Sequence, residues 1–314
     1  MSYGTLPGAP EPQKGELEIP LQLDDENLHR AVKQHAPGTS LIAIERMTGG
    51  VSAEVYRLEL LNAGGVKENV VLRLHGETHY GHDAELEFQT LDALFRAGIP
   101  VPRPLALDAS CAILDHPFLI MAFVDGHSDI EPTKIKTRIE TMVEHLISIH
   151  DVPIGALPAL PRRIDPVPEL LEFLPSAAAW DDFRVRLNRL KSSPFEGPDA
   201  VLHGDYWPSN LLWSGGQIAA ILDWEDAAIG DPLSDVACAC LELRYIYGKD
   251  GMDLFEAAYA RHCEIDRNRF ALWLAYVSAA AMRFMGDWGL EPAREAQMRQ
   301  AAHDTLRESA ETLI

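Results

Sequence analysis

The stretch VLHGDYWPSNLLWSGGQIAAILDWED, residues 201–226, contains two short apolar runs, LLW and IAAIL, on either side of Ser-Gly-Gly-Gln. Two adjacent glycines in so short a connection favour a tight β-hairpin, because both central residues of that turn take positive φ. Pairing the strands about this turn sets Trp213 opposite Ile218 and Leu211 opposite Ala220. The hairpin therefore brings together the polar residues that precede its first strand and those that follow its second.

Three of these polar residues, Asp205, Asn210 and Asp223, form a chemically coherent set. The amide oxygen of Asn210 and the carboxylate of Asp223 are hard oxygen ligands. They suit Mg²⁺, which takes few protein ligands and fills its other positions with water and phosphate oxygens. A second carboxylate beside such a metal, here Asp205, can accept a proton or orient a hydroxyl. The three residues together predict a phosphoryl-transfer site.

The composition restricts the classes of protein to which the chain can belong. Its 314 residues are 47% hydrophobic, which suits two lobes with packed interiors. The formal net charge of −21 argues against binding to nucleic acid or to an anionic membrane, and it is compatible with a cationic small-molecule partner. No apolar run is long enough to cross a bilayer. Scattered cysteines and the lack of a signal-peptide pattern predict a cytoplasmic protein.

The pattern of apolar residues divides the chain into a strand-rich front and a helix-rich back. We expect a flexible, proline- and glycine-rich arm over residues 1–20 and extended chain over residues 99–104, where prolines exclude a helix. Strands are predicted at residues 41–46, 55–60, 70–74 and 118–124, and helices at residues 82–97, 139–150, 181–191, 233–247, 252–263 and 267–286. The pattern changes near residues 122–128, where we place a hinge.

The motif HGD-x4-N at residues 203–210, the hairpin, and ILDWE at residues 221–225 resemble the core of the aminoglycoside phosphotransferase and choline kinase-like family. The segment IGDPLSDVA, residues 229–237, resembles the family's sequence after its metal-binding Asp. The Asp-x4-Asn spacing equals that of the kinase catalytic loop. The resemblance implies an α+β, protein-kinase-like fold of two lobes. The small β-rich N-terminal lobe would span residues 21–124, and the larger, mainly helical C-terminal lobe residues 125–314.

The resemblance also implies a reaction and roles for the motif residues. The protein is expected to be a kinase that transfers the γ-phosphate of ATP, with GTP as an alternative donor, to a hydroxyl of a small molecule. Asp205 would orient this hydroxyl and take its proton, and His203 would act beside it, mainly as a brace for the loop. Asn210 and Asp223 would hold Mg²⁺ against the phosphate oxygens.

For the nucleotide, the resemblance points to a loop and a hinge strand in the N-terminal lobe. Thr-Gly-Gly-Val-Ser, residues 48–52, falls between the first two predicted strands, where the family covers the ATP phosphates. Glycines there let backbone N–H groups approach phosphate oxygens, although a plain hairpin remains the alternative. The residues expected to contact the nucleotide from this loop and from the adenine-binding hinge are Gly49, Gly50, Ser52, Met121, Phe123 and Val124.

The third predicted strand should carry a cation for the phosphates, usually Lys in this family. Arg73 is the best match, because an Arg also binds phosphate, whereas Lys67 precedes the predicted strand. A simple strand-face charge is the alternative for Arg73. The next helix should supply a carboxylate to this cation, and we favour Glu87 over Glu85, because only one of them can face inward. The three histidines within residues 75–82 are interpreted as part of a solvated loop.

The acceptor alcohol is expected over the C-terminal lobe, near Asp205. Acidic side chains there would suit an amino sugar or another cationic alcohol, and aromatic ones a sugar ring or a quaternary amine. The candidates for this lining are Trp180, Asp181, Asp182, Tyr206, Trp207, Glu225, Asp226, Glu242, Tyr245, Trp273, Arg283 and Asp287. Two other functions remain open. One is a nucleotide-binding pseudokinase, and the other is a metal-dependent hydrolase, for which a further metal-binding cluster is missing.

Overall fold

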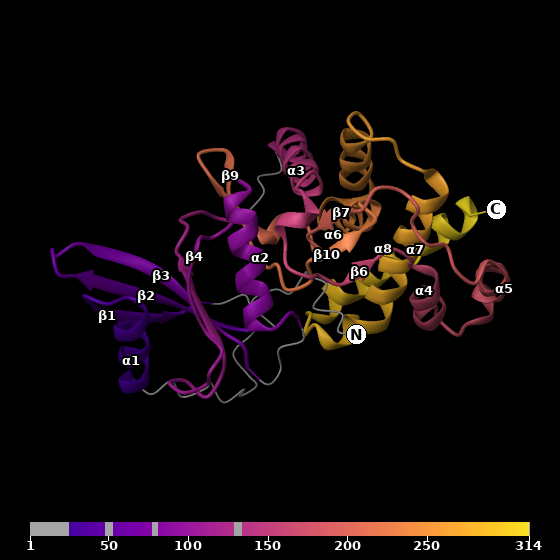
Figure 1. Cartoon of the computed structure of the whole chain (residues 1–314). Coiled ribbons are helices and arrows are strands. Elements are labelled where there is room, and N and C mark those ends of the chain that lie inside the picture. Colours follow the sequence, from indigo (N-terminus) through magenta and orange to yellow (C-terminus); the bar gives the residue numbers. More distant parts are fainter. Residues whose placement is uncertain (1–24, 48–52, 77–80, 129–133, 314) are drawn as a thin grey trace.

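The computed structural model describes residues 25–47, 53–76, 81–128 and 134–313. The predicted arm over residues 1–20 lies outside this part of the chain. The described residues form two lobes, a β-sheet lobe and a helical lobe, which lie at opposite ends of the molecule in Figure 1. This arrangement is the predicted α+β, protein-kinase-like fold. Among the residues that the structure describes, no helix combines the length and apolar character needed to cross a membrane.

The N-terminal lobe is built on one antiparallel sheet with the strand order β1-β2-β3-β5-β4. Its strands are β1 (Thr39–Arg46), β2 (Glu54–Asn62), β3 (Lys67–Leu74), β4 (Pro104–Asp108) and β5 (Phe118–Ala122). Two helices accompany the sheet, α1 (Asp25–His35) and α2 (Ala84–Arg96). Successive side chains of a strand point to opposite faces. Phe118 and Ile120 accordingly pack in one core with α1, whereas Leu119 and Met121 pack in another core with α2.

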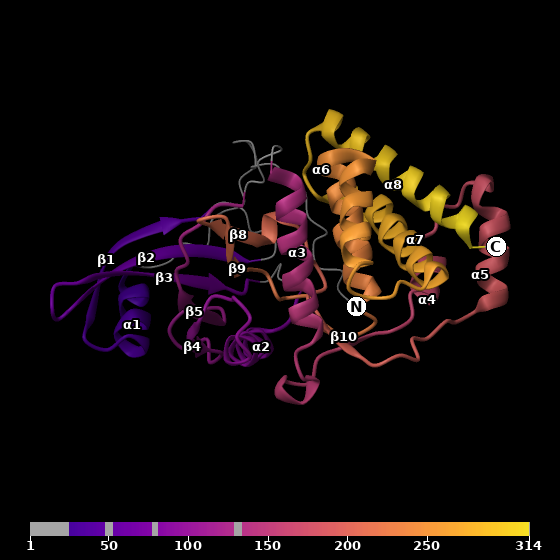
Figure 2. The ribbon, with the colours of Figure 1, turned by 90° about the horizontal axis from the view of Figure 1, so that it is seen from above.

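The C-terminal lobe is mainly helical. Its helices are α3 (Ile135–His150), α4 (Val167–Phe173), α5 (Asp181–Leu190), α6 (Leu233–Tyr259), α7 (Arg267–Phe284) and α8 (Pro292–Thr312). Short 3₁₀ turns are η2 (Ile154–Ala156), η3 (Ala178–Trp180), η4 (Pro208–Asn210) and η5 (Met285–Asp287). Figure 2 shows α3 between the strands of the N-terminal lobe and the helices α6, α7 and α8. The two helices predicted at residues 233–247 and 252–263 are both present within α6, which is interrupted at Gly248, where the backbone is not helical (φ 70°, ψ −167°).

Two small sheets carry the loops of the C-terminal lobe that matter for function. One contains β6 (Arg162–Arg163), β7 (Ala200–Leu202) and β10 (Ala228–Gly230), and the other is the hairpin of β8 (Leu211–Ser214) and β9 (Gln217–Ile221). Both loops with predicted functional residues start or end on these strands. The one before β8 carries Asp205 and Asn210, and the one after β9 carries Asp223.

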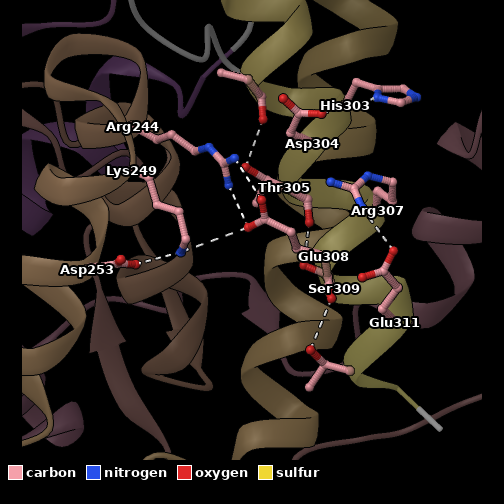
Figure 3. A network of polar contacts seen from close by, with 12 residues as sticks. Arg244, Lys249, Asp253, His303, Asp304, Thr305, Arg307, Glu308, Ser309 and Glu311 are labelled. Atoms are coloured by element: carbon pink, nitrogen blue, oxygen red, sulfur yellow. Dashed lines mark hydrogen bonds and ion pairs between the residues drawn. The ribbon is translucent and has the colours of Figure 1, made fainter.

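The last helix is tied to α6 by a charged contact (Figure 3). Arg244 of α6 donates to both carboxylate oxygens of Glu308 of α8, over 2.8 and 2.9 Å. Lys249 lies 4.0 Å from the same carboxylate. The hydrogen bonds from Arg244 lower the pKa of Glu308 below its ordinary value. The pair therefore fixes α8 against α6 at neutral pH.

The segment that joins the two lobes docks on the hairpin. His127 pairs with Trp213 through two backbone hydrogen bonds, of 3.1 and 2.8 Å. A Cβ on Gly126 would lie 3.0 Å from the carbonyl oxygen of Trp213, so a side chain there would require this neighbour to shift by a few tenths of an ångström. Strand β5 ends at Ala122, two residues before the predicted strand end. A hinge at residues 122–128 remains a prediction about motion.

Candidate active site

The loop that presents Asp205 leaves β7 through a position that only glycine can occupy. Gly204 has a φ of +88°, and a Cβ there would lie 2.1 Å from the carbonyl oxygen of Asp226. A side chain at this position would therefore clash with backbone and also strain the left-handed conformation. The loop packs closely against the segment that follows Asp223, and Asp205 therefore lies beside that segment.

The hairpin has the predicted turn, and its register differs from the prediction at one end. Gly215 and Gly216 take positive φ values of 58° and 83°. Trp213 lies opposite Ile218, as predicted. Leu211 lies opposite Ile221 and not Ala220, because the register shifts by one residue between β8 positions 212 and 213. The shift brings the start of β8 level with the end of β9 at the open end of the hairpin.

Asn210 and Asp223 flank this open end. The backbone N–H of Leu222 donates to the carbonyl oxygen of Asn210 over 2.8 Å. The side-chain amide of Asn210 donates to Asp205, over 2.9 Å to the carbonyl oxygen and 3.0 Å to Oδ2. Both bonds use Nδ2, so the Asn210 Oδ1 is left for a cation. Asp223 has a φ of 63° and a side chain that is 29% exposed, so its carboxylate is within reach of a ligand.

This donor set fits Mg²⁺, which needs few protein ligands beside phosphate and water oxygens. In the described residues, no group of three or more His, Cys, Asp or Glu side chains is arranged as a metal site. A Zn²⁺-type centre normally uses three or four such ligands. The described site therefore lacks the additional ligands that a metal-dependent hydrolase based on His203 and Asp205 would need.

Asp205 is a buried carboxylate, 5% exposed. Burial raises its pKa well above the ordinary value, and the nearby charges of Asp226 and Asp223 raise it further. The Cys238 thiol lies 3.8 Å from Oδ1 as a weak donor. A carboxylate with a raised pKa is a stronger base when it is ionised, which suits a group that takes a proton from a hydroxyl.

His203 is fully buried and contacts the frame of the loop. Its Nε2 donates to the carbonyl oxygen of Leu222 over 2.9 Å, and its Nδ1 accepts from the backbone N–H of Asp205 over 3.2 Å. Burial lowers the pKa of His203, so the ring stays neutral, in agreement with one donating and one accepting nitrogen. These contacts give His203 a bracing position between the loop and the strand end before Asp223.

Asp235, near the start of α6, holds the same loop from behind. Its two carboxylate oxygens accept from the backbone N–H groups of His203 and Gly204, over 2.8 and 2.9 Å. His150 Nε2 lies 3.3 Å from Oδ2. Burial alone would raise the pKa of Asp235, but the hydrogen bond and charge of His150 lower it below the ordinary value. Asp235 therefore holds the loop as an ionised carboxylate.

Arg73 is the centre of a buried ion cluster. Its Nε lies 3.3 Å from Glu87, and its Nη2 lies 3.1 Å from Asp223 and 2.5 Å from Glu225. Burial would lower the pKa of Arg73, but the three carboxylates together raise it, so the side chain stays charged. Glu87 is 2% exposed, whereas Glu85 lies on the exposed face of α2. The cluster joins β3, α2 and the segment after β9.

Two sequence-based interpretations are wrong near this cluster. Glu225, a candidate for the acceptor lining, pairs with Arg73. Lys67 begins β3 rather than preceding it, and it pairs with Glu59 at the surface. The histidines around residues 75–82 were expected in solvent, yet His75 is 5% exposed and lies 3.0 Å from Glu87. The interpretation failed because it used local spacing alone, while the partners lie elsewhere in the chain.

The start of α2 is also fastened to the segment after Asp223. The backbone N–H of His82 donates to the carbonyl oxygen of Glu225 over 3.0 Å, and its Nε2 lies 2.7 Å from the carbonyl oxygen of Ala227. A Cβ on Gly81 would lie 2.3 Å from the Glu225 Cβ, so glycine permits this contact. The helix that carries Glu87 is thereby held in register with the segment that carries Asp223.

The predicted nucleotide contacts are placed only in part. Gly49, Gly50 and Ser52 lie outside the described residues. Met121 is a buried residue of β5, where it pairs with Val71 of the neighbouring strand. The two residues after the strand, Phe123 and Val124, are half-buried, and the Arg57 guanidinium lies 4.7 Å from the Phe123 ring centroid.

Several of the proposed acceptor-lining residues have structural partners. The Tyr206 hydroxyl donates to the carbonyl oxygen of Met142 over 2.8 Å, and the Trp273 indole N–H donates to Asp231. Trp180 packs edge-on against His303. These three side chains are therefore committed to holding the lobe together.

Glu242, Tyr245 and Trp207 differ from them, because their polar atoms are buried without a hydrogen-bond partner in the described structure. This holds for both carboxylate oxygens of Glu242, for the Tyr245 hydroxyl and for the Trp207 indole nitrogen. Burial raises the pKa of Glu242 well above the ordinary value. Its charge in turn raises the pKa of Asp205, so the two carboxyl groups lie close enough to interact. Unsatisfied buried polar groups call for an explanation such as a ligand or a water.

Comparison with known proteins agrees with this geometry. The model of the phosphotransferase enzyme family matches residues 43–273. Mouse acyl-CoA dehydrogenase family member 10 is 29% identical over 178 residues, which is 51% of this chain and 17% of the relative. Chicken acyl-CoA dehydrogenase family member 11 is 24% identical over 260 residues, which is 74% of this chain and 32% of the relative. The chain thus spans no more than about a third of these relatives.

Solved structures of similar fold cover both lobes. A putative aminoglycoside phosphotransferase of Ralstonia eutropha has a TM-score of 0.67 at 20% identity, over 92% of this chain and 98% of that chain. A choline/ethanolamine kinase family protein of Mesorhizobium loti has a TM-score of 0.63 at 19% identity, with the same coverage of 92% and 98%. A thermostable aminoglycoside phosphotransferase mutant, solved with AMP-PNP and hygromycin B, has a TM-score of 0.61 at 14% identity over 90% and 98%. The chain belongs to the phosphotransferase enzyme family, and it has a protein-kinase-like fold.

Proposed function

We propose that the protein is an ATP-dependent, Mg²⁺-dependent kinase that transfers the γ-phosphate to a hydroxyl of a small molecule. The observation that carries the proposal is the convergence of Asp205, Asn210 and Asp223, with Arg73 in contact with the last of them. GTP remains the alternative donor. A cytoplasmic location also remains a proposal.

Asp205 is proposed to hold the acceptor hydroxyl and take its proton late in the transfer. The amide of Asn210 fixes the Asp205 carboxylate, and the brace formed by His203 and Asp235 fixes the loop. Mg²⁺, when it is bound by Asn210 and Asp223, would neutralise charge that develops on the phosphate oxygens. The chain itself thus supplies positioning and a base, and these are the main protein contributions in phosphoryl transfer.

Arg73 is proposed to hold the nucleotide phosphates in the place of the usual Lys. The guanidinium is kept in position by Glu87 and Glu225, and it reaches the Asp223 carboxylate. A nucleotide phosphate can take over the contact with Asp223, since Arg binds phosphate and carboxylate with the same donors. The glycine-rich loop at residues 48–52 and the hinge residues Met121, Phe123 and Val124 are proposed to complete the nucleotide site.

The acceptor is proposed to be a cationic alcohol, such as an amino sugar. Glu242, Tyr245 and Trp207 offer a carboxyl group, a hydroxyl and an indole N–H that no protein group satisfies in the described structure. An acceptor with both ammonium and hydroxyl groups could pair with Glu242 and Tyr245, which lie close enough for the Glu242 charge to raise the pKa of Tyr245. An entering ammonium would also favour ionisation of the buried Glu242 carboxyl. Hygromycin B, which is bound in one structure of similar fold, is an example for that protein.

The first experiment is a calorimetric titration of ATP and GTP, with and without Mg²⁺, into the wild-type protein and Asp223→Ala. We expect Mg²⁺-dependent binding that the substitution abolishes. A panel of amino sugars and amino alcohols is then tested for phosphate transfer by the wild type and by Asp205→Asn. Nucleotide binding without transfer to any acceptor would favour the pseudokinase alternative, and transfer by Asp205→Asn at the wild-type rate would exclude the proposed base.

A further inference from the structure

A cavity lies in the C-terminal lobe, away from the residues assigned to phosphoryl transfer. Its volume is about 820 Å³, and it lies between the segment 193–200, the end of α3, both ends of α6 and the start of α7. Sites for small organic ligands have volumes of roughly 300 to 1,000 Å³. Asp205, Asn210 and Asp223 are not among its lining residues. The size of the cavity suits a small molecule, and the hydrogen-bonding groups on its wall indicate the charge of that molecule.

The hydrogen-bond donors at the helix starts are already satisfied by protein carboxylates. The backbone N–H of Leu233, at the start of α6, donates to Asp231 Oδ1 over 3.0 Å. At the start of α7, the N–H groups of Asn268 and Arg269 donate to Asp266 Oδ1, over 2.9 and 3.1 Å. Helix N-termini attract anions, but here each one is capped by an anion of the chain itself. A phosphate or carboxylate ligand would have to displace these caps.

The arginine of the wall is committed as well. The Arg269 guanidinium donates to the Asp231 carboxylate and, over 2.7 Å, to the carbonyl oxygen of Ser193. It also donates to the carbonyl oxygen of Ile164 over 2.5 Å and lies 5.2 Å from the centroid of the Phe195 ring. The Arg269 guanidinium is therefore already bound to protein oxygens and is not available to an anionic ligand.

Hydrogen-bond acceptors and apolar groups, in contrast, remain available on the wall. Asp151, Glu196 and Glu264 are exposed, and in the described part of the chain they take part in no ion pair. The ends of α3 and α6 also face this cavity, and helix C-termini favour positive charge. Phe195 and Leu272 add an aromatic ring and an apolar side chain. The geometry points to a second ligand site, and we propose that it binds a small organic cation with an apolar body, such as an arylalkylamine.

An occupant of this site would contact the groups that support the catalytic loop. The Tyr259 hydroxyl lies 3.3 Å from His150 Nδ1, and both residues line the cavity. His150 Nε2 lies 3.3 Å from Asp235, which accepts hydrogen bonds from the backbone of His203 and Gly204. The proposed ligand is thus separated from the loop that presents Asp205 by a short chain of contacts. The binding itself does not depend on phosphoryl transfer, so it can be tested without nucleotide.

The test uses Cys263, a partly exposed thiol on the cavity wall, as a reporter. Cys111 is exposed and is replaced in a Cys111→Ser background, whereas Cys238 and Cys240 are buried. Alkylation of Cys263 by iodoacetamide is followed by mass spectrometry in the presence of 2-phenylethylamine or its neutral isostere 2-phenylethanol. We expect the amine to slow alkylation roughly tenfold at ten times its Kd, because only the free protein reacts. The alcohol should protect at least tenfold less well at the same concentration.

Two charge variants complete the test. The cavity variant carries Asp151→Asn, Glu196→Gln and Glu264→Gln, and the control carries the same charge change at exposed sites elsewhere, Glu68→Gln, Asp115→Asn and Glu172→Gln. Protection by the amine should be lost in the cavity variant and kept in the control. Equal protection by amine and alcohol, no protection by the amine, or full protection in the cavity variant would each overturn the proposal. If Cys263 does not react even without a probe, saturation-transfer NMR measures binding of the same two probes to the same variants. The proposal then requires binding of the amine that exceeds binding of the alcohol and is lost only in the cavity variant.

Discussion

Glu225→Gln tests whether the charges around Arg73 work as one unit. Glu225 Oε2 lies 2.5 Å from Arg73 Nη2, and the two residues are 3% and 8% exposed. The substitution keeps the shape of the side chain and removes its charge. Removing one partner of an isolated buried ion pair costs about 3–5 kcal/mol. Arg73 keeps Glu87 and Asp223, so the expected loss is closer to that of one charged hydrogen bond, roughly 1.5–3 kcal/mol.

This loss should appear as a lower free energy of unfolding, and Mg²⁺-ATP binding should weaken by at most roughly 10- to 100-fold at 1.4 kcal/mol for each factor of ten. The reason is that Arg73, once released from Glu225, pairs more closely with Asp223 and competes with the metal for that carboxylate. Calorimetry at several Mg²⁺ concentrations measures both the Kd and the Mg²⁺ requirement, which should rise. Glu85→Gln is the matched control, because it makes the same change on the exposed face of α2.

Repeating the experiment in an Arg73→Lys background separates positioning from general damage. A Lys ammonium is one compact charge and cannot span three carboxylates on two elements as the guanidinium does. Glu225→Gln should therefore weaken Mg²⁺-ATP binding less in that background, with a coupling energy between the two substitutions of at least about 1 kcal/mol. Equal losses in both backgrounds, or a Kd that Glu225→Gln leaves unchanged, would refute the reasoning.

Three further predictions concern the loop, the acceptor site and the last helix. Gly204→Ala should lower the free energy of unfolding by more than about 2 kcal/mol in urea titrations, whereas Gly215→Ala, at a positive φ with open space, should cost about 1 kcal/mol. Burial raises the pKa of Glu242, so its contribution to stability is fully present at low pH and lost as the pH rises through the raised value. Relative to Glu242→Gln, the wild type should thus lose stability as the pH rises above the ordinary glutamate pKa, and the variant should bind cationic acceptors more weakly. Glu308→Gln should lower stability by less than about 1 kcal/mol at pH 7 and have no effect below the lowered pKa of Glu308, as thermal unfolding across pH can check.

The parts of the site that could be predicted from the sequence depend on local geometry. The Gly215-Gly216 turn fixes the hairpin, and the hairpin places Asn210 beside the strand end before Asp223. The inward direction of Glu87 follows from the apolar stripe of its helix. The register error at Leu211 arose because a bulge within a strand leaves no clear signal in the turn.

Other parts of the fold could not be derived in this way. Residues 99–104 were predicted as extended chain, and the strand β4 that begins at Pro104 was not predicted; β4 is an edge strand, and an edge tolerates proline. Helices α1 and α8 were not predicted. Both have low mean hydropathy, and tertiary contacts such as that of Arg244 with Glu308 support α8. The contact between Arg73 and Glu225 joins residues 152 positions apart, which no local pattern can indicate.

The contact of Arg73 with Glu225 also explains why an Arg stands where the family usually has Lys. Three carboxylates, on α2 and after β9, converge on this one side chain. A lysine could offer hydrogen bonds from a single nitrogen, and it would leave part of this buried negative charge without a partner. The guanidinium donates to Asp223 and Glu225 through Nη2, and its Nε lies 3.3 Å from the Glu87 carboxylate in an ion pair. Arg73 and Glu225 are therefore best understood as one feature of the sequence. The carboxylate of Glu225 requires a guanidinium at position 73, and this guanidinium keeps Asp223 in place for the metal.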